Sequence, residues 1–547
     1  MKFQAIKGVR DILPPDSALW NRVEQAAREV FETYGYGEIR LPIFEPTELF
    51  ARSIGAETDV VSKEMYTFED RSRSAAELTQ RCEEITQNPP SIRDASLFIS
   101  YQRSVLALGE NLKRAMASGQ VPRTAENEQR LRKVLELLEA AESLGLKNLG
   151  EDVDAATFGG YLKGIAENFK SFQFGDSLTL RPEATASVVR AYIEHGLYNR
   201  PGNTKLYYMG PMFRRERPQK GRYRQFYQIG AELLGSSDHA ALDAEVLEML
   251  LAFFARVGLQ GAILSINSIG DKNCRPAYVE LLRAELTKVR DKLGPDSQRR
   301  IETNPLRVLD SKVPDEQSII ATLPRIADRL CAECKEHYAK LQDELALRDI
   351  AYQENWRLVR GLDYYMRTTF EITAPGLGSQ DAVCGGGRYD GLVELLGGPA
   401  TTKCIGFAIG TDRLVLSLQA QAASSLNASS GAVSSAIAGM SSVAASASAP
   451  AGVEVFLAWL GGATYHAAVV LARRLRGQGI SVELPPVAMK FGKALNLASR
   501  LGARHAVIIG EDELASGQFT VKRLADGEQK KLSGSDLLAY LLSARKP

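Results

Sequence analysis

The stretch from Lys205 to Gly235, KLYYMGPMFRRERPQKGRYRQFYQIGAELLG, constrains the fold more than any other segment of the sequence. Runs of aromatic and aliphatic residues flank a polar loop from Arg217 to Arg222. This pattern predicts two antiparallel strands joined by a hairpin. A hairpin whose strands carry charged and polar side chains at alternating positions is expected to place them on the surface of a sheet, where a ligand could lie.

Alternation along these strands groups the polar side chains. Arg214 and Glu216 should share one face of the first strand, and Gln228, Gly230 and Glu232 should share one face of the second. Because the glycine has no side chain, it leaves an open space on the surface of the sheet between two polar groups. Arginines at the mouth of the hairpin suit phosphate, because a guanidinium can bind two oxygens at once. A solvated surface hairpin is the alternative, but it leaves the polar row on the second strand unexplained.

The overall composition is that of an ordinary globular protein with several domains. The chain has 547 residues, too many for one core, and Lys+Arg 67 against Asp+Glu 66 leaves a net charge of +1. Any phosphate or nucleic-acid site must therefore come from local charge placement. No signal peptide or membrane span is expected, and six scattered cysteines do not form a disulfide framework. These features favour a cytoplasmic protein with reduced thiols.

Pattern and composition divide the chain into segments of an α+β fold. Residues 1–71 and 172–418 are expected to form an antiparallel sheet flanked by helices, with a mostly helical insertion at about 260–350. Residues 72–171, rich in Glu, Lys, Arg, Ala and Leu, are predicted to be a second helical insertion, with Arg71 close to Gly175. Residues 419–452 form an Ala/Ser-rich linker, and 453–547 a small α/β domain.

Further polar clusters lie on strand-like or glycine-rich segments. TLRPEAT contains Glu183 and Thr185, and a carboxylate there could hold an ammonium group. LVRGLDYY contains Arg360, and VCGGGRYDGL places three glycines before Tyr389, so the backbone can approach a ligand closely. GFAIGTDRL ends in Arg413. Together these groups would suit a zwitterion beside a polyphosphate, although each cluster alone is a weak signal.

The sequence contains one weak candidate motif for a metal and no common nucleotide-binding motif. There is no P-loop, and no dinucleotide fingerprint follows a strand. Cys331-Ala-Glu-Cys334 with His337 could suggest zinc, but there is no second CxxC, and a structural site needs a fourth ligand. No protein-bound metal site is therefore expected.

The motifs together resemble those of bacterial histidyl-tRNA synthetases, a family of class II aminoacyl-tRNA synthetases. FRRERPQKGRYRQF resembles motif 2 of that class, GFAIGTDRL motif 3, and YGEIRLPIFEPTELF the dimer-forming motif 1. LVRGLDYY and GGGRYDGL resemble the two signatures of the histidine enzymes. The C-terminal segment resembles their anticodon-binding domain, whereas residues 72–171 and the linker have no counterpart in the pattern.

The resemblance implies an activity: ATP-dependent formation of histidyl-adenylate with Mg²⁺, then transfer of histidine to tRNA(His) by a homodimer. It also implies roles for matching positions. The residues implied in ATP binding are Arg214, Glu216, Arg222 and Arg413, of which Arg214 would meet the α-phosphate and Arg413 the γ-phosphate end. The residues implied in histidine binding are Glu183, Thr185, Gln228, Glu232, Arg360, Tyr365 and Tyr389. Arg360 and Arg214 would be the catalytic pair at the reacting phosphate, and Gln219 would face the acceptor end of tRNA.

Some positions depart from the family pattern, and other interpretations stay open. Ala184 stands where a glycine is expected, and Thr411 and Asp412 replace an apolar residue and Glu before the motif 3 arginine. The main alternative is the non-catalytic, histidine-binding regulatory paralogue of ATP phosphoribosyltransferase. A class II synthetase for another amino acid and a purely tRNA-binding module are further possibilities. The presence of Arg214, Arg222, Arg360 and Arg413, and of the C-terminal domain, argues against the regulator.

Overall fold

The structure is a computed structural model that describes residues 3–55, 58–70, 124–147, 175–378, 381–429 and 453–544, with a few helical residues between 107 and 168. It divides into two compact units. One comprises residues 1–43, 49–65 and 181–547, and the other residues 44–48 and 66–180.

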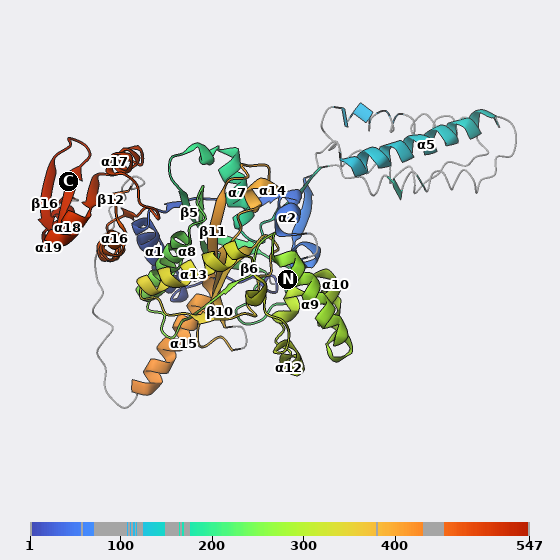
Figure 1. Cartoon of the computed structure of the whole chain (residues 1–547). Helices are drawn as coiled ribbons and strands as arrows, with labels where there is room; N and C mark the ends of the chain where they lie inside the picture. Colours follow the sequence, from blue (N-terminus) through green and yellow to red (C-terminus); the bar gives the residue numbers. More distant parts are fainter. Residues whose placement is uncertain are drawn as a thin grey trace. The chain divides into compact units, whose positions relative to one another are not determined.

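An eight-stranded sheet organises the larger unit (Figure 1). Its strands, in spatial order, are β1 (Gly37–Glu38), β5 (Thr204–Phe213), β6 (Gln225–Gly235), β11 (Lys403–Gly410), β10 (Ala382–Arg388), β9 (Met366–Thr373), β7 (Ile263–Ser268) and β8 (Gln353–Glu354). The six central strands run antiparallel to their neighbours, and only the outer pairs β1–β5 and β7–β8 are parallel. The predicted hairpin is confirmed as β5–β6, with its loop extended to residues 214–224.

Long helices cover one face of this sheet. They are α1 (Asp16–Thr33), α8 (Ala240–Val257), α13 (Ala332–Leu347) and α15 (Thr411–Ser429). In α1, Trp20, Val23, Ala27 and Phe31 recur at helical spacing and are buried in the main core. Pro15 precedes this helix, and no side chain of the described residues caps its first turn.

The opposite face of the sheet is only partly covered. Helices α7 (Thr185–Glu194) and α14 (Leu392–Leu395) pack there against Tyr208, Leu234 and Cys404. Because side chains alternate, Tyr207 enters the main core while Tyr208 faces this second side. The uncovered part of this face is where a ligand can reach the sheet.

A helical segment with its own core follows β7. Its longer helices are α9 (Arg275–Lys288) and α10 (Pro295–Thr303), followed by the short α11 (Leu306–Leu309) and α12 (Gln317–Ile320). Tyr278, Leu282 and Ile301 are buried inside it. Residues 263–268, expected in the helical insertion, instead form a strand, because Leu264 and Ile266 pack into the main core.

The smaller unit contains a three-stranded antiparallel sheet and one long described helix (Figure 1). The strands are β2 (Phe44–Pro46), β4 (Asp176–Leu180) and β3 (Tyr66–Asp70), and the helix is α5 (Ala125–Lys147). Asp70 lies opposite Asp176, so the two ends of the insertion meet as predicted, although Arg71 itself is outside the described residues. On α5, Val134 is buried, whereas Leu131 and Leu135 are half-buried.

The C-terminal segment forms a five-stranded sheet covered by helices (Figure 1). Its strand order is β13 (Val482–Glu483), β12 (Val455–Trp459), β14 (His505–Ile509), β15 (Gln518–Arg523) and β16 (Gln529–Ser533). Its helices are α16 (Gly462–Arg476), α17 (Phe491–Arg500), α18 (Glu511–Ser516) and α19 (Gly534–Ser543). The β15–β16 hairpin was not predicted. Strands β13, β12 and β14 lie in the segment for which the sequence predicts a small α/β domain.

The first part of the predicted linker, residues 419–429, is instead helical. Helix α15 continues to Ser429, because Ala, Gln and Leu favour helix and Gln419 donates a hydrogen bond to Asp16. Residues 430–452 lie outside the described residues. Within the described ranges, no helix combines the length and the apolar content that crossing a bilayer requires.

Candidate active site

A cavity of about 290 Å³ opens on the partly covered face of the large sheet. Most of the predicted ligand-binding residues line it: Glu183, Thr185, Arg214, Glu216, Arg222, Gln228, Arg360, Tyr365 and Arg413. These residues come from segments more than two hundred positions apart in the sequence, and the fold brings them to one place. Glu232 and Tyr389 lie buried beside the cavity, while Gln219 lies exposed in the hairpin loop.

The floor of the cavity consists of small residues on adjacent strands. On β6, the row Gln228, Gly230 and Glu232 lies opposite Gly410, Ala408 and Gly406 of β11, and Ala408 in turn lies opposite Gly385 of β10. Three neighbouring strands therefore present glycine or alanine at the same level. Only hydrogen atoms or a methyl group project from the sheet at these positions, so a flat ligand can lie directly on the backbone.

Two of these glycines are required by close contacts. A Cβ on Gly385 would lie 2.1 Å from Nη2 of Arg360, so the guanidinium crosses β10 where there is no side chain. A Cβ on Gly406 would lie 1.6 Å from Oε2 of Glu232. The glycine-rich signatures of the sequence therefore make room for two ionisable side chains of the site.

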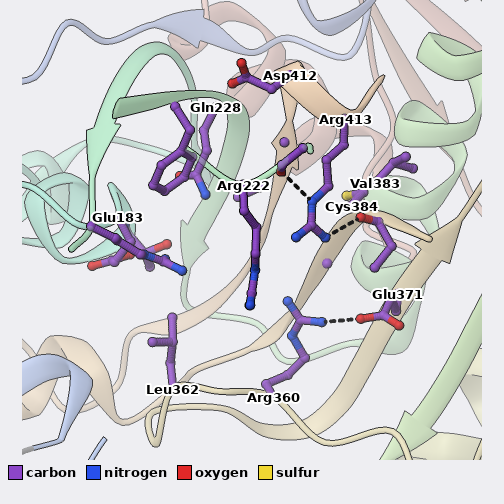
Figure 2. A pocket seen from close by; sticks show the side chains of 18 of the residues that line it. Glu183, Arg222, Gln228, Arg360, Leu362, Glu371, Val383, Cys384, Asp412 and Arg413 are labelled. Carbon is purple, nitrogen blue, oxygen red and sulfur yellow. Dashed lines mark hydrogen bonds and ion pairs between the residues drawn. The ribbon is translucent and has the colours of Figure 1, made fainter. Parts of the chain in front are cut away.

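One end of the cavity gathers arginines. Figure 2 shows Arg222, Arg360 and Arg413 approaching the same space from different elements. Arg413 donates through Nε to the Gly221 carbonyl at 3.1 Å and through Nη1 to the Ala382 carbonyl at 3.0 Å. Arg360 pairs with Glu371 at 3.1 Å, and Arg222 pairs with Glu216 at 2.9 Å.

The electrostatics of this end favour an anion. Burial, and next the positive charge of Arg222, lower the pKa of Arg413. Arg214 lies over the Phe226 ring at 5.3 Å and donates through Nε to the Pro182 carbonyl at 2.9 Å. These contacts fix the guanidinium groups before any ligand arrives, so a polyphosphate would meet preorganised donors.

The other end of the cavity gathers buried carboxylates. Glu183 accepts hydrogen bonds from the backbone N–H groups of Thr185 at 2.7 Å and Ala186 at 3.0 Å, at the start of α7. Glu232 accepts from the Thr185 hydroxyl at 2.7 Å and from the Tyr389 hydroxyl at 2.6 Å. Burial raises the pKa of Glu183, and it raises the pKa of Glu232 to about 8.

Two polar atoms at this end have no hydrogen-bond partner among the described residues. They are Oε1 of Gln228 and the hydroxyl of Tyr208, both buried in residues that line the cavity. Buried polar groups without partners are uncommon in folded proteins. Their position beside two carboxylates makes them candidates to bind the ammonium and ring nitrogens of a small ligand.

Several residues of the site escaped the sequence analysis. Tyr208, Tyr364 and Glu371 line the cavity, and the Tyr364 hydroxyl donates to Glu183 at 3.4 Å. Strand alternation offered one signal, since Tyr208 lies directly opposite Gly230. Asp412, to which no role was given, is buried and accepts hydrogen bonds from Arg10 at 2.7 Å and from the Tyr227 backbone at 2.8 Å, so it secures the first turn of α15.

Known family profiles and full-length proteins match this chain. The family profile described as histidyl-tRNA synthetase matches residues 163–414, and the anticodon binding domain profile matches residues 454–544. The chain is 42% identical over 543 residues to a histidine–tRNA ligase of Koribacter versatilis, covering 98% of this chain and 96% of that one. It is also 42% identical to the histidine–tRNA ligase of Solibacter usitatus, covering 99% of both chains.

A solved structure of the apo histidyl-tRNA synthetase of S. aureus is 30% identical, with a TM-score of 0.48, and covers 99% of this chain and 100% of that one. The assignment itself depends on the full-length sequence relatives. With this degree of identity along nearly the whole of both partners, the chain belongs to the histidyl-tRNA synthetase family.

Proposed function

We propose that this cavity is where the chain, as a histidine–tRNA ligase, joins histidine to ATP and then to tRNA. The observation that carries the proposal is the convergence of Arg214, Arg360 and Arg413 on one cavity whose far end holds Glu183. Fixed cations at one end suit a triphosphate. A carboxylate at the other end, with polar atoms that lack a partner within the described part of the chain, suits a zwitterionic amino acid.

In the proposed reaction the histidine carboxylate attacks the α-phosphorus of ATP, and pyrophosphate leaves. Arg360 lies between the arginine end and the tyrosines of the acid end, 5.8 Å from the Tyr365 ring, and can meet both the α-phosphate and the amino-acid carboxylate. Arg214 stabilises charge on the α-phosphate, while Arg222 and Arg413 bind the outer phosphates. The step needs positioning and charge neutralisation rather than a protein nucleophile.

The acid end supplies the specificity for histidine. Glu183, Thr185 and Gln228 hold the ammonium group, and Glu232, Tyr365 and Tyr389 surround the imidazole. Because Glu232 already accepts from Tyr389 and Thr185, its carboxylate is oriented before the ring enters. An apolar competitor would leave these buried polar groups unpaired, which costs enough to reject it strongly.

Mg²⁺ fits the phosphate end of the cavity. This ion prefers oxygen ligands, and proteins bind it through one or two carboxylates together with substrate phosphates. Glu216 and Glu371 both line the cavity beside the arginines and would hold it. When bound, the ion would neutralise charge on the triphosphate, while the arginines hold the same oxygens in place.

The remaining partners are proposed from the family and from the surface. The C-terminal sheet would bind the tRNA anticodon, and Gln219, exposed in the hairpin loop, would face the acceptor end. The segment resembling motif 1 carries the exposed apolar side chains of Ile43 and Phe44, which supports a homodimer. We place the enzyme in the cytoplasm. Residues 1–71 and 172–418 would form the catalytic core, with 453–547 as the anticodon-binding domain.

The proposal is tested by ATP–pyrophosphate exchange with each amino acid separately, followed by charging of tRNA(His). Exchange should depend on histidine alone, and Arg413→Gln should abolish it. The matched control is Arg256→Gln, because Arg256 is an exposed arginine paired with Glu29 outside the cavity. Exchange with another amino acid would reject the specificity. Histidine binding without any exchange would instead favour a regulatory protein.

A further inference from the structure

Four side chains outside the active site form a compact cluster of possible metal ligands: Asp271, Cys274, Cys331 and Cys334. One ligand atom from each lies within 4.8 Å of every other. Asp271, Cys274 and Cys334 are buried, and Cys331 is half-buried. We propose that these four residues bind one zinc ion as a closed structural site.

The distances agree with tetrahedral zinc. With bonds of about 2.3 Å to sulfur and about 2.0 Å to oxygen, neighbouring sulfurs should lie about 3.8 Å apart and a sulfur and an oxygen about 3.5 Å apart. Sγ of Cys274 lies 3.9 Å from Sγ of Cys334 and 3.5 Å from Oδ1 of Asp271. Sγ of Cys331 lies 3.9 Å from the same Oδ1. Little movement would be needed to admit the ion.

The four residues are separated along the sequence as the ligands of structural zinc sites commonly are. Cys331-Ala-Glu-Cys334 is one pair separated by two residues, and Asp271-Lys-Asn-Cys274 is a second pair with the same separation. No metal site was expected because the sequence has no second CxxC; the second pair has an aspartate in place of its first cysteine. His337, the other candidate, lies apart from the cluster, with Nε2 3.5 Å from Asp243.

The backbone around the cluster is built to receive thiolates. The Asp271 backbone N–H points to Sγ of Cys274 at 3.4 Å, and the Asn273 N–H donates to the Asp271 carboxylate at 2.9 Å. Gly270 has φ +67°, and a Cβ there would lie 2.8 Å from Sγ of Cys274. Nη2 of Arg367 lies 3.6 Å from Oδ2 of Asp271. This positive charge would balance the negative charge of the ligands, as groups around metal ligands commonly do.

The position of the cluster indicates its purpose. Asp271 and Cys274 stand where the chain leaves strand β7, and Cys331 and Cys334 stand where it enters α13. Zinc there would tie together both ends of the helical segment 275–330. Binding would release the thiol protons and leave three thiolates and a carboxylate on the ion, with no open position for catalysis.

The experiment is elemental analysis of the full-length chain purified without chelator. We expect about one zinc ion per chain. Cys274→Ser and Cys334→Ser should lose the zinc, while Asp271→Cys should retain it, because a fourth thiolate preserves the ligand set. The matched control is Cys404→Ser, a buried cysteine on β11 outside the cluster, which should keep the full zinc content.

A second measurement keeps the test decisive if a serine variant fails to fold. Chelator-treated wild-type chain, titrated with Co²⁺, should develop the intense visible and near-ultraviolet bands of tetrahedral thiolate-bound cobalt, and Zn²⁺ should abolish them. A chain without zinc whose six cysteines all titrate as thiols, and which develops no such bands, would overturn the proposal. A Cys274–Cys334 disulfide found by mass spectrometry, or zinc retained by both serine variants, would overturn it equally.

Discussion

The hydroxyl of Tyr389 donates a 2.6 Å hydrogen bond to the carboxylate of Glu232, and both side chains are fully buried. The tyrosine follows the glycine-rich strand β10, whereas the glutamate lies on β6, two strands away in the sheet. The pair therefore links the GGGRYDGL signature to the β5–β6 hairpin, and both residues are proposed to contact the imidazole. Because Glu232 is buried, its ionisation also affects the unfolding free energy of the ligand-free chain.

Replacing Glu232 by Gln should change the pH dependence of stability. Burial raises the pKa of Glu232 from 4.5 to about 8, so the folded state holds a proton that the unfolded state releases. The contribution of Glu232 to stability is thus full below about pH 4.5 and is lost as the pH rises toward 8.

The difference is measured by chemical denaturation of the ligand-free chain from pH 5 to pH 9. Relative to Glu232→Gln, the wild-type unfolding free energy should fall by at most about 1.4 kcal/mol per pH unit across that window. Parallel curves for the two proteins would mean that Glu232 ionises normally.

Gly385→Ala should weaken catalysis and leave the fold intact. The new Cβ would occupy the space of the Arg360 guanidinium, whose flexible end can move aside, so the sheet survives while the catalytic arginine is displaced. We expect a loss on the order of 10²-fold in the rate of ATP–pyrophosphate exchange, the size typical of removing one preorganised donor. Gly492→Ala is the control, because a Cβ at this position on α17 meets nothing within 4 Å.

Gln228→Ala should separate binding from stability. Oε1 of Gln228 is buried and has no partner among the described residues, so its removal should change the unfolding free energy of the empty chain by no more than about 1 kcal/mol. The dissociation constant for histidine should rise at least about tenfold, which corresponds to about 1.4 kcal/mol.

Denaturation measures the first effect, and calorimetric titration with histidine measures the second. Gln25→Ala, on the exposed side of α1, should change neither. Unchanged histidine affinity in Gln228→Ala would remove this residue from the proposed ammonium site.

Phe44→Asp should weaken self-association. Phe44 is 52% exposed on β2, and its ring lies 6.0 Å from that of Phe68, which is 44% exposed, so both rings contribute apolar surface to the motif 1 region. In the proposed homodimer this surface is buried, and a charge placed there costs several kcal/mol, so a monomer should appear at micromolar concentration in sedimentation experiments. Phe3→Asp is the matched control, since Phe3 is 97% exposed and lies outside the segment that resembles motif 1. A wild-type chain that sediments as a monomer would reject the homodimer directly.

Local patterns were enough to predict a large part of this fold. The β5–β6 hairpin, helix α1 and the three parallel strands of the C-terminal sheet follow from alternation and helical spacing, which depend on neighbours in the sequence. Strand β7 and the β15–β16 hairpin were missed. Ile263–Ser268 is short and lies between helices, and it becomes a strand by pairing with β9.

The order of amino acids sets which chemical groups the protein has: arginines for phosphate, acids and tyrosines for an amino acid, and cysteines in a spaced pair. The tertiary structure alone decided which of them meet. Register places Gly406 opposite Glu232 and lets Arg360 cross Gly385, and the return of the chain at α13 brings Cys334 to Cys274. Such contacts join residues far apart in the sequence, and their geometry is set by strand pairing and core packing rather than by any local pattern.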